Sequence, residues 1–348
     1  MWRSRLAVGV LVFAGLAAAS TNGGTQAPAP PPVRDLLRTI AQVTDVEWAT
    51  VNRGEPMAKV LATDTREIAV TGAVRIAASS EHLIARYREV ENLKRSAIVL
   101  DLGRFTKPPR PSDLATVPME EYNLDLRECR PGDCRVRLSA ADIARFQRDV
   151  DWRAADWRER SRAVWVDVLA GYAAAYTREG RRALPTFANK AEPLSVPAEL
   201  SLVVDRFGFV GDIAPPFLAY LREFGPDGPD GVDEVLYWSK EDFGVRPVLR
   251  LSHQTIYRTP RSQTILVATN QIYADHYLDA GLTVTMAIDA SESHGAPAFY
   301  MVSVSRARTR SLSGFMRSFV RSTVQGRSRD ALQKILGSTK TSLEQQAR

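Results

Sequence analysis

The sequence predicts an α+β protein, in which an antiparallel curved sheet packs on a long C-terminal helix and a helical insertion lies in the middle. The second half holds strand-like segments at residues 234–238, 248–257, 264–273, 282–288 and 298–305. Their short connections favour antiparallel pairing. From about Ser311, apolar residues recur at helical spacing, so a helix there must bury one face on the sheet. Residues 139–225 are mostly helical and alanine-rich, which gives the insertion.

The first twenty residues have the features of a secretory signal peptide. Arg3 and Arg5 precede an uncharged apolar run, which ends in small residues at 17–20. The run is shorter than the ~20 residues of a membrane-spanning helix, and an uncleaved anchor is the alternative. Residues 21–32 form a proline-rich spacer, so residues 33–348 are expected to form a single α+β domain with its insertion at about 139–225. We expect an exported protein, periplasmic or extracellular.

The charge balance limits the classes of partner. The formal net charge is +6, and most of the cations are arginines without a dense cluster. A balance of this size does not indicate a nucleic-acid partner. Peripheral contact with an anionic membrane surface stays open, because Arg310, Arg317 and Arg321 would share a face of the terminal helix. A solvated helix face is the simpler interpretation.

The two cysteines, Cys129 and Cys134, predict a disulfide. An even cysteine count in an exported chain favours pairing, and Pro131-Gly132 between them is a turn dipeptide. We expect the bond to hold a turn between two strands at residues 122–126 and 135–138. The spacing is not Cys-x-x-Cys, so a redox-active pair is the less favoured alternative.

The first half and the ends of the helices give weaker patterns. We expect a helix at residues 33–43, a hairpin from 46–53 and 58–61, and strands at 67–76 and 97–102. Ser79 or Ser80 should cap the helix that follows residue 76, and Ser139 should cap the first helix of the insertion. Gly326 is expected to interrupt the terminal helix.

Motifs of the common catalytic and phosphate-binding sites are missing from the sequence. It has no Gly-x-Ser-x-Gly, no His-Glu-x-x-His and no glycine-rich phosphate loop, and it indicates neither a cofactor nor a metal. His253 and His276 are the weak catalytic candidates. On a strand, Asp275 and Tyr277 would point away from His276, so a general base would need a carboxylate from another strand. An enzymatic role is therefore not favoured.

Two resemblances add to these patterns. The segments 128–134, 237–240, 271–277 and 303–310 resemble those of predicted exported bacterial proteins of unknown function, which brings no activity with it. The order of elements is similar in topology to the START-like, or SRPBCC, helix-grip fold. That resemblance implies a cavity between the sheet and the terminal helix that holds lipids, sterols, polyketides or other apolar molecules. The insertion departs from the simple form of the fold and would act as a lid.

From these patterns we expect an exported binding protein that holds an apolar, lipid-like small molecule between the sheet and the C-terminal helix. The alternatives are a structural or assembly partner in the cell envelope without a ligand, and a hydrolase or cyclase that uses His253 and His276. Candidate ligand-binding residues are the aromatic residues of the last strands and the terminal helix: Trp238, Tyr257, Tyr273, Tyr277, Phe299, Phe315 and Phe319.

Overall fold

The computed structural model describes residues 33–91, 99–118, 122–226, 228–242, 246–260, 264–310 and 317–347. The expected signal peptide and spacer lie outside these ranges, and so does Phe315. Among the helices described, none is both long and apolar enough to span a membrane.

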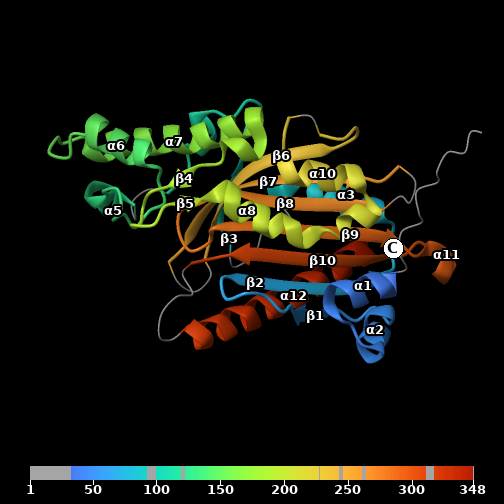
Figure 1. The fold of residues 1–348 in the computed structure, drawn as a ribbon. Coiled ribbons are helices and arrows are strands. Elements are labelled where there is room, and N and C mark those ends of the chain that lie inside the picture. Colours follow the sequence, from blue (N-terminus) through green and yellow to red (C-terminus); the bar gives the residue numbers. More distant parts are fainter. Residues whose placement is uncertain are drawn as a thin grey trace, which may run out of the picture.

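Eight of the described strands form an antiparallel sheet in the order β1-β2-β10-β9-β8-β7-β6-β3 (Figure 1). Their bounds are β1 (Met57–Val60), β2 (Glu67–Ile76), β3 (Val99–Arg104), β6 (Asp233–Glu241), β7 (Val248–Arg258), β8 (Ile265–Ala274), β9 (Ala280–Asp289) and β10 (Phe299–Arg308). The predicted antiparallel meander is confirmed from β6 to β10. The last strand of the meander, β10, also pairs with β2 and so joins the two halves of the chain.

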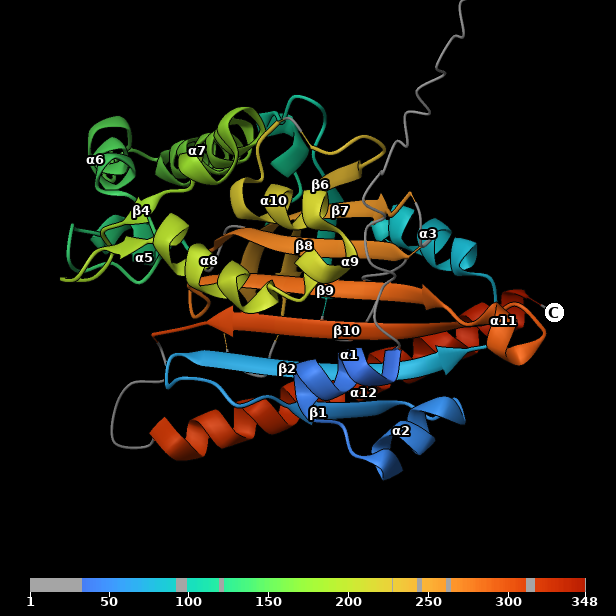
Figure 2. The same ribbon diagram turned by 45° about the vertical axis from the view of Figure 1, so that its right-hand side comes forward.

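The long helix α12 (Arg317–Gln346) packs on β2 and β1, behind the sheet in the view of Figure 2. Leu332 and Leu336 share a buried cluster there with Val70 and Val74. A Cβ on Gly72 would lie 2.7 Å from Leu336 Cδ1, so the close approach of this helix requires glycine. The shorter α3 (Ser80–Arg88) lies on the same face, with Ser79 as its N-cap.

The terminal helix continues through Gly326, so the expected interruption is wrong. A glycine inside a helix costs only about 1 kcal/mol relative to alanine. Burial of Leu332, Leu336 and Leu343 on the sheet face outweighs that cost.

The opposite face of the sheet carries the helical insertion. Its elements are η1 (Pro111–Leu114), α5 (Asn123–Glu128), α6 (Ala140–Asp149), α7 (Trp157–Glu179), η2 (Gly180–Ala183), the pair β4 (Thr186–Phe187) and β5 (Leu194–Ser195), α8 (Val196–Val204), η3 (Asp205–Phe207), α9 (Val210–Ile213) and α10 (Pro215–Glu223). α7 packs on β8, and α8 packs on β9 and β10 (Figure 2). Because β3 and β6 pair directly, the insertion begins near Phe105, earlier than expected. It covers the face opposite α12.

The first strand of the predicted hairpin is a helix instead. Residues 46–53 fall in α2 (Asp45–Asn52), which follows α1 (Val33–Ala41), so the hairpin is wrong. Thr44 accepts a hydrogen bond from Glu47 N, and the Glu47 carboxylate accepts one from Thr44 N. This capping box satisfies two backbone donors at the helix start, and β1 pairs with β2 instead.

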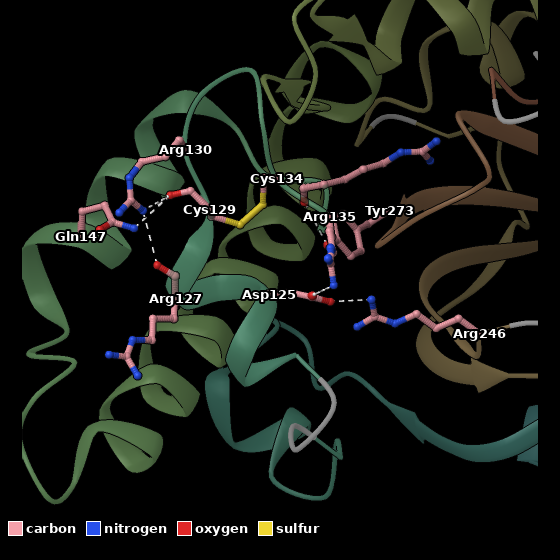
Figure 3. Close-up of a disulfide and its surroundings, with 10 residues drawn as sticks. Asp125, Arg127, Cys129, Arg130, Cys134, Arg135, Gln147, Arg246 and Tyr273 are labelled. Carbon is pink, nitrogen blue, oxygen red and sulfur yellow. Dashed lines mark hydrogen bonds and ion pairs between the residues drawn. A yellow bond between two sulfur atoms is a disulfide. The ribbon is translucent and has the colours of Figure 1, made fainter.

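The predicted disulfide between Cys129 and Cys134 is present (Figure 3). The bond follows α5 rather than a strand, so the expected pair of flanking strands is wrong. The α5 side chain Asp125 is buried and lies 2.5 Å from an Arg246 guanidinium nitrogen and 3.4 Å from one of Arg135. The disulfide therefore closes a turn beside an ion-pair cluster that joins the insertion to the segment before β7.

Candidate functional site

A cavity of about 300 Å³ opens at the edge of the sheet where β3 ends. β3 pairs with β6 from Tyr237 onward, and one further bond runs from Phe105 N to Leu236 O. The first residues of β6 therefore extend beyond β3, and the cavity lies between them, the end of α3 and the chain after β3. Its lining is Tyr87, Arg88, Arg104, Phe105, Lys107, Asp233, Glu234, Val235, Leu236, Gln254 and Ile256.

The cavity combines apolar walls with charges. Phe105, Leu236 and Ile256 are buried apolar side chains of its lining. Arg88 pairs with Asp233 at 2.7 Å, and Arg104 pairs with Glu91. These pairs are partly exposed, so each contributes little to stability and can exchange partners at low cost. A lining of this kind fits a molecule with an apolar body and polar groups.

Glu234 connects the cavity to a buried chain of polar side chains. Its Oε1 accepts a hydrogen bond of 2.5 Å from Tyr220 OH and lies 3.5 Å from His253 Nε2. His253 Nδ1 lies 3.0 Å from Tyr176 OH, and that hydroxyl accepts a hydrogen bond of 3.1 Å from Asn270 Nδ2. The chain runs from α7 and α10 of the insertion across β6, β7 and β8.

The direction of these bonds assigns the tautomer of His253. Because Tyr176 OH accepts from Asn270, its own proton is free to be donated to His253 Nδ1. Nε2 of the neutral ring then carries the proton and points it toward Glu234. Burial, the largest influence, raises the pKa of Glu234, but His253 and Tyr220 together outweigh it and bring the pKa to about 2. Glu234 is therefore a carboxylate at neutral pH and the end point of the chain.

This arrangement does not make His253 available as a general base. Both of its ring nitrogens face partners, and the side chain is only 4% exposed. The Glu234 side chain is 32% exposed and lines the cavity, so Glu234 is the member of the chain that a ligand can reach. Sequence reasoning missed it. The sequence pattern that could have identified it is the spacing in β6. Glu234 lies two and four residues before Leu236 and Trp238, whose side chains face the insertion, so all three side chains share one face of the strand.

His276 lies in the loop after β8, not on a strand, so its expected separation from Asp275 is wrong. His276 Nδ1 lies 3.0 Å from Asp275 Oδ1, and Nε2 donates to Pro247 O at 3.1 Å. Burial, with the nearby charge of Arg246, lowers the pKa of His276 to about 4. The Nε2 bond and the burial of the ring hold His276 in place.

The structure does not bring the two histidines into one site. Asp275 N donates to Leu249 O, which places His276 beside the start of β7. His253 lies four residues farther along that strand, a separation of about 13 Å at ~3.3 Å per residue. That distance is beyond the roughly 8 Å within which the two rings could share one substrate.

The predicted aromatic ligand-binding residues are divided between the two faces of the sheet. Trp238, Tyr257 and Tyr273 are buried on the insertion side, and Phe299 is buried on the α12 side. Tyr277 lies in the loop after β8 with its ring against that of His276. Phe319 belongs to α12, but the surroundings of its side chain are outside the described part. Of those whose side chains are described, none lines the 300 Å³ cavity.

The arginines considered for membrane contact are bonded within the protein where the structure describes them. Arg310 precedes α12 and donates to Glu192 O at 3.1 Å. Arg321 donates to Thr63 Oγ1 and to Asp64 O, both at 2.7 Å. These bonds attach the start of α12 to the loop before β2. The side chain of Arg317 lies outside the described part.

Glu234→Gln tests the charged end of the buried chain. Because the folded pKa lies below the usual 4.5, the carboxylate stabilises the fold above pH 4.5, and this contribution is lost as the pH falls toward 2. After allowance for solvent screening, we expect the substitution to cost about 1 kcal/mol at pH 7. Urea unfolding at pH 7 and pH 3 measures it, with exposed Glu128→Gln as the control. Equal stability of Glu234→Gln and the unsubstituted protein at pH 7 would contradict this role.

Comparison with known proteins finds no relative that would assign a role to these residues. No family model, no curated protein and no solved structure matches the chain.

Proposed function

We propose that this chain is an exported binding protein for a small amphipathic molecule, held in the cavity at the β6 edge. The observation that carries the proposal is the 300 Å³ cavity with apolar walls and a charged rim. Binding sites for small molecules are concave and mostly apolar, with a few polar groups that orient the ligand. His253 and His276 are both buried, with His253 Nδ1 bonded to Tyr176 OH and His276 Nε2 bonded to Pro247 O, which favours binding over acid–base catalysis.

The topology supports the same proposal. A curved antiparallel sheet with a C-terminal helix packed on it is similar to the START-like helix-grip arrangement, in which a small molecule is held next to the sheet. In this chain the cavity adjoins α3 and β6, so the ligand would enter beside α3 rather than along α12. Its apolar part would contact Phe105, Leu236 and Ile256. Lys107 is an exposed cation of the lining and would meet an anionic or hydroxylated group at the rim.

Native mass spectrometry of protein purified from the exported fraction, followed by organic extraction, tests the proposal. We expect a discrete added mass that extracts as an amphipathic compound. Leu236→Trp should abolish it by filling the cavity, and Leu202→Trp, on an exposed face of α8, should leave it unchanged. Lys107→Glu, at an exposed position, is the second variant in case Leu236→Trp does not fold.

The same variants are measured with 8-anilinonaphthalene-1-sulfonate, whose fluorescence rises in apolar sites. Dye binding that is lost in Leu236→Trp and kept in Leu202→Trp supports the proposal. Two results together would overturn the proposal: a native mass equal to that of the protein alone, and dye binding that neither Leu236→Trp nor Lys107→Glu changes.

A further inference from the structure

The start of β6 has an edge that no strand among the described residues pairs with. Beyond the paired part of β3, Phe105 N adds one bond to Leu236 O. The chain then turns away from β6, because Thr106 N donates to Asp113 Oδ2 at 3.0 Å. Residues 233–235 therefore have β7 on one side and no strand on the other, and we name this side the unpaired β6 edge.

The cavity runs along the unpaired β6 edge and reaches both faces of the sheet. Four consecutive residues of β6, at positions 233–236, line it, although neighbours in a strand point to opposite faces. The lining also includes Phe105 from the insertion side and Ile256 from the α12 side. A cavity with such a lining lies beside the strand, where β3 would continue, rather than over one face of the sheet.

The backbone of Glu234 faces this space. Because Leu236 O points toward β3 and alternate residues of a strand point the same way, the N–H and C=O of Glu234 point away from β7. The pairing of β6 with β7 is regular from Asp233 to Glu241, so no bulge changes this direction. Within the described part of the chain, neither the N–H nor the C=O of Glu234 has a hydrogen-bond partner. One donor and one acceptor thus remain at the spacing that a residue of a neighbouring strand would fill.

We propose that the ligand is an N-acyl amino acid, which pairs with Glu234 as a residue of an added strand does. In an antiparallel pair, two residues that face each other exchange both hydrogen bonds. The amide N–H of the ligand donates to Glu234 O, and its carboxylate accepts from Glu234 N–H. The acyl chain contacts Phe105 and Leu236, and the exposed cation of Lys107 faces the carboxylate at the rim. This inference rests on the proposed function, since the acyl chain is the apolar part of the same ligand.

Titration calorimetry with N-octanoylglycine and O-octanoylglycolate, both below any micelle concentration, tests the pairing. The two probes share the acyl chain and the carboxylate, and they differ only in the ester oxygen that replaces the amide N–H. We expect the amide to bind about tenfold tighter, because only the amide can donate to Glu234 O. Equal affinities for the two probes would overturn the pairing and leave the proposed function standing. Binding of neither probe, while Leu236→Trp still removes dye binding, would overturn the pairing alone, whereas failure of the probes and the dye together would overturn both.

Glu234→Pro removes the backbone donor of the unpaired β6 edge, and Glu234→Ala is its matched control. Both variants lose the carboxylate, but only the alanine variant keeps the N–H. Because this N–H points away from β7, proline there breaks no bond of the sheet, and the two variants should melt at similar temperatures. We expect the preference for the amide probe to persist in Glu234→Ala and to be lost in Glu234→Pro. An equal preference in both would contradict the inference, and the comparison of the two probes on the unsubstituted protein decides it if Glu234→Pro does not fold.

Discussion

Asp279→Ala is expected to destabilise the protein by about 3–5 kcal/mol, because it leaves a buried arginine without its counter-charge. The Asp279 side chain is fully buried, and that of Arg137 is 7% exposed. Arg137 donates to Asp279 Oδ1 and to Leu278 O. Burial raises the pKa of Asp279 and lowers that of Arg137, so the interior opposes both charges. Their contact favours the ionised pair, and Arg66 and Arg310 lie farther from the carboxylate, at 3.7 Å and 3.9 Å.

Chemical unfolding in urea measures this loss, and the chain offers a matched control. Asp45 also lies between two arginines, at 2.6 Å from Arg34 and 2.8 Å from Arg38, but its side chain is 72% exposed. Asp45→Ala should therefore cost far less than Asp279→Ala. Replacement of both buried partners, Arg137→Met with Asp279→Leu, should recover most of the stability, since no unpaired charge remains. A cost for Asp279→Ala no larger than that for Asp45→Ala would show that the buried pair does not hold the insertion on the sheet.

Trp165→Ala is expected to cost about 3–5 kcal/mol, since it opens a large cavity where the insertion meets the sheet. The fully buried Trp165 ring of α7 lies 5.4 Å from the ring of Tyr122, 6.4 Å from Phe146 and 6.3 Å from Tyr273 on β8. One side chain thus connects three parts of the insertion with the sheet.

Urea unfolding followed by tryptophan fluorescence and circular dichroism measures the effect. Trp157→Ala is the control, because its half-buried ring at the start of α7 contacts Trp152 at 5.7 Å and the Arg158 guanidinium at 4.4 Å. We expect about 1 kcal/mol for the control and an intermediate loss for Trp165→Phe, which keeps part of the ring. If both alanine variants unfold at the same urea concentration as the unsubstituted protein, the aromatic cluster does not anchor the insertion.

Much of the architecture was predictable from local patterns. The alternation of apolar residues gave β2 with its observed bounds and β7 to within one residue, because a strand that buries side chains repeats every second residue. Ser139 and either Ser79 or Ser80 were predicted as caps. Ser79 and Ser139 act as caps, since their side chains bond backbone donors in the next turn. The failure at α2 has a local cause as well: the capping box at Thr44 and Glu47 was present in the sequence and indicated a helix.

The sequence by itself determined the strands of the second half, their antiparallel order and the disulfide, because these depend on periodicity, short connections and neighbouring residues. Only the tertiary structure decided which face of the sheet each element covers. Both faces of β2 and β7 are buried, so alternation does not tell the α12 side from the insertion side. Glu234, His253, Tyr176 and Asn270 come from four separate elements and meet only through strand pairing and the docking of α7. The candidate site depends on such long-range contacts, which no local pattern in the chain encodes.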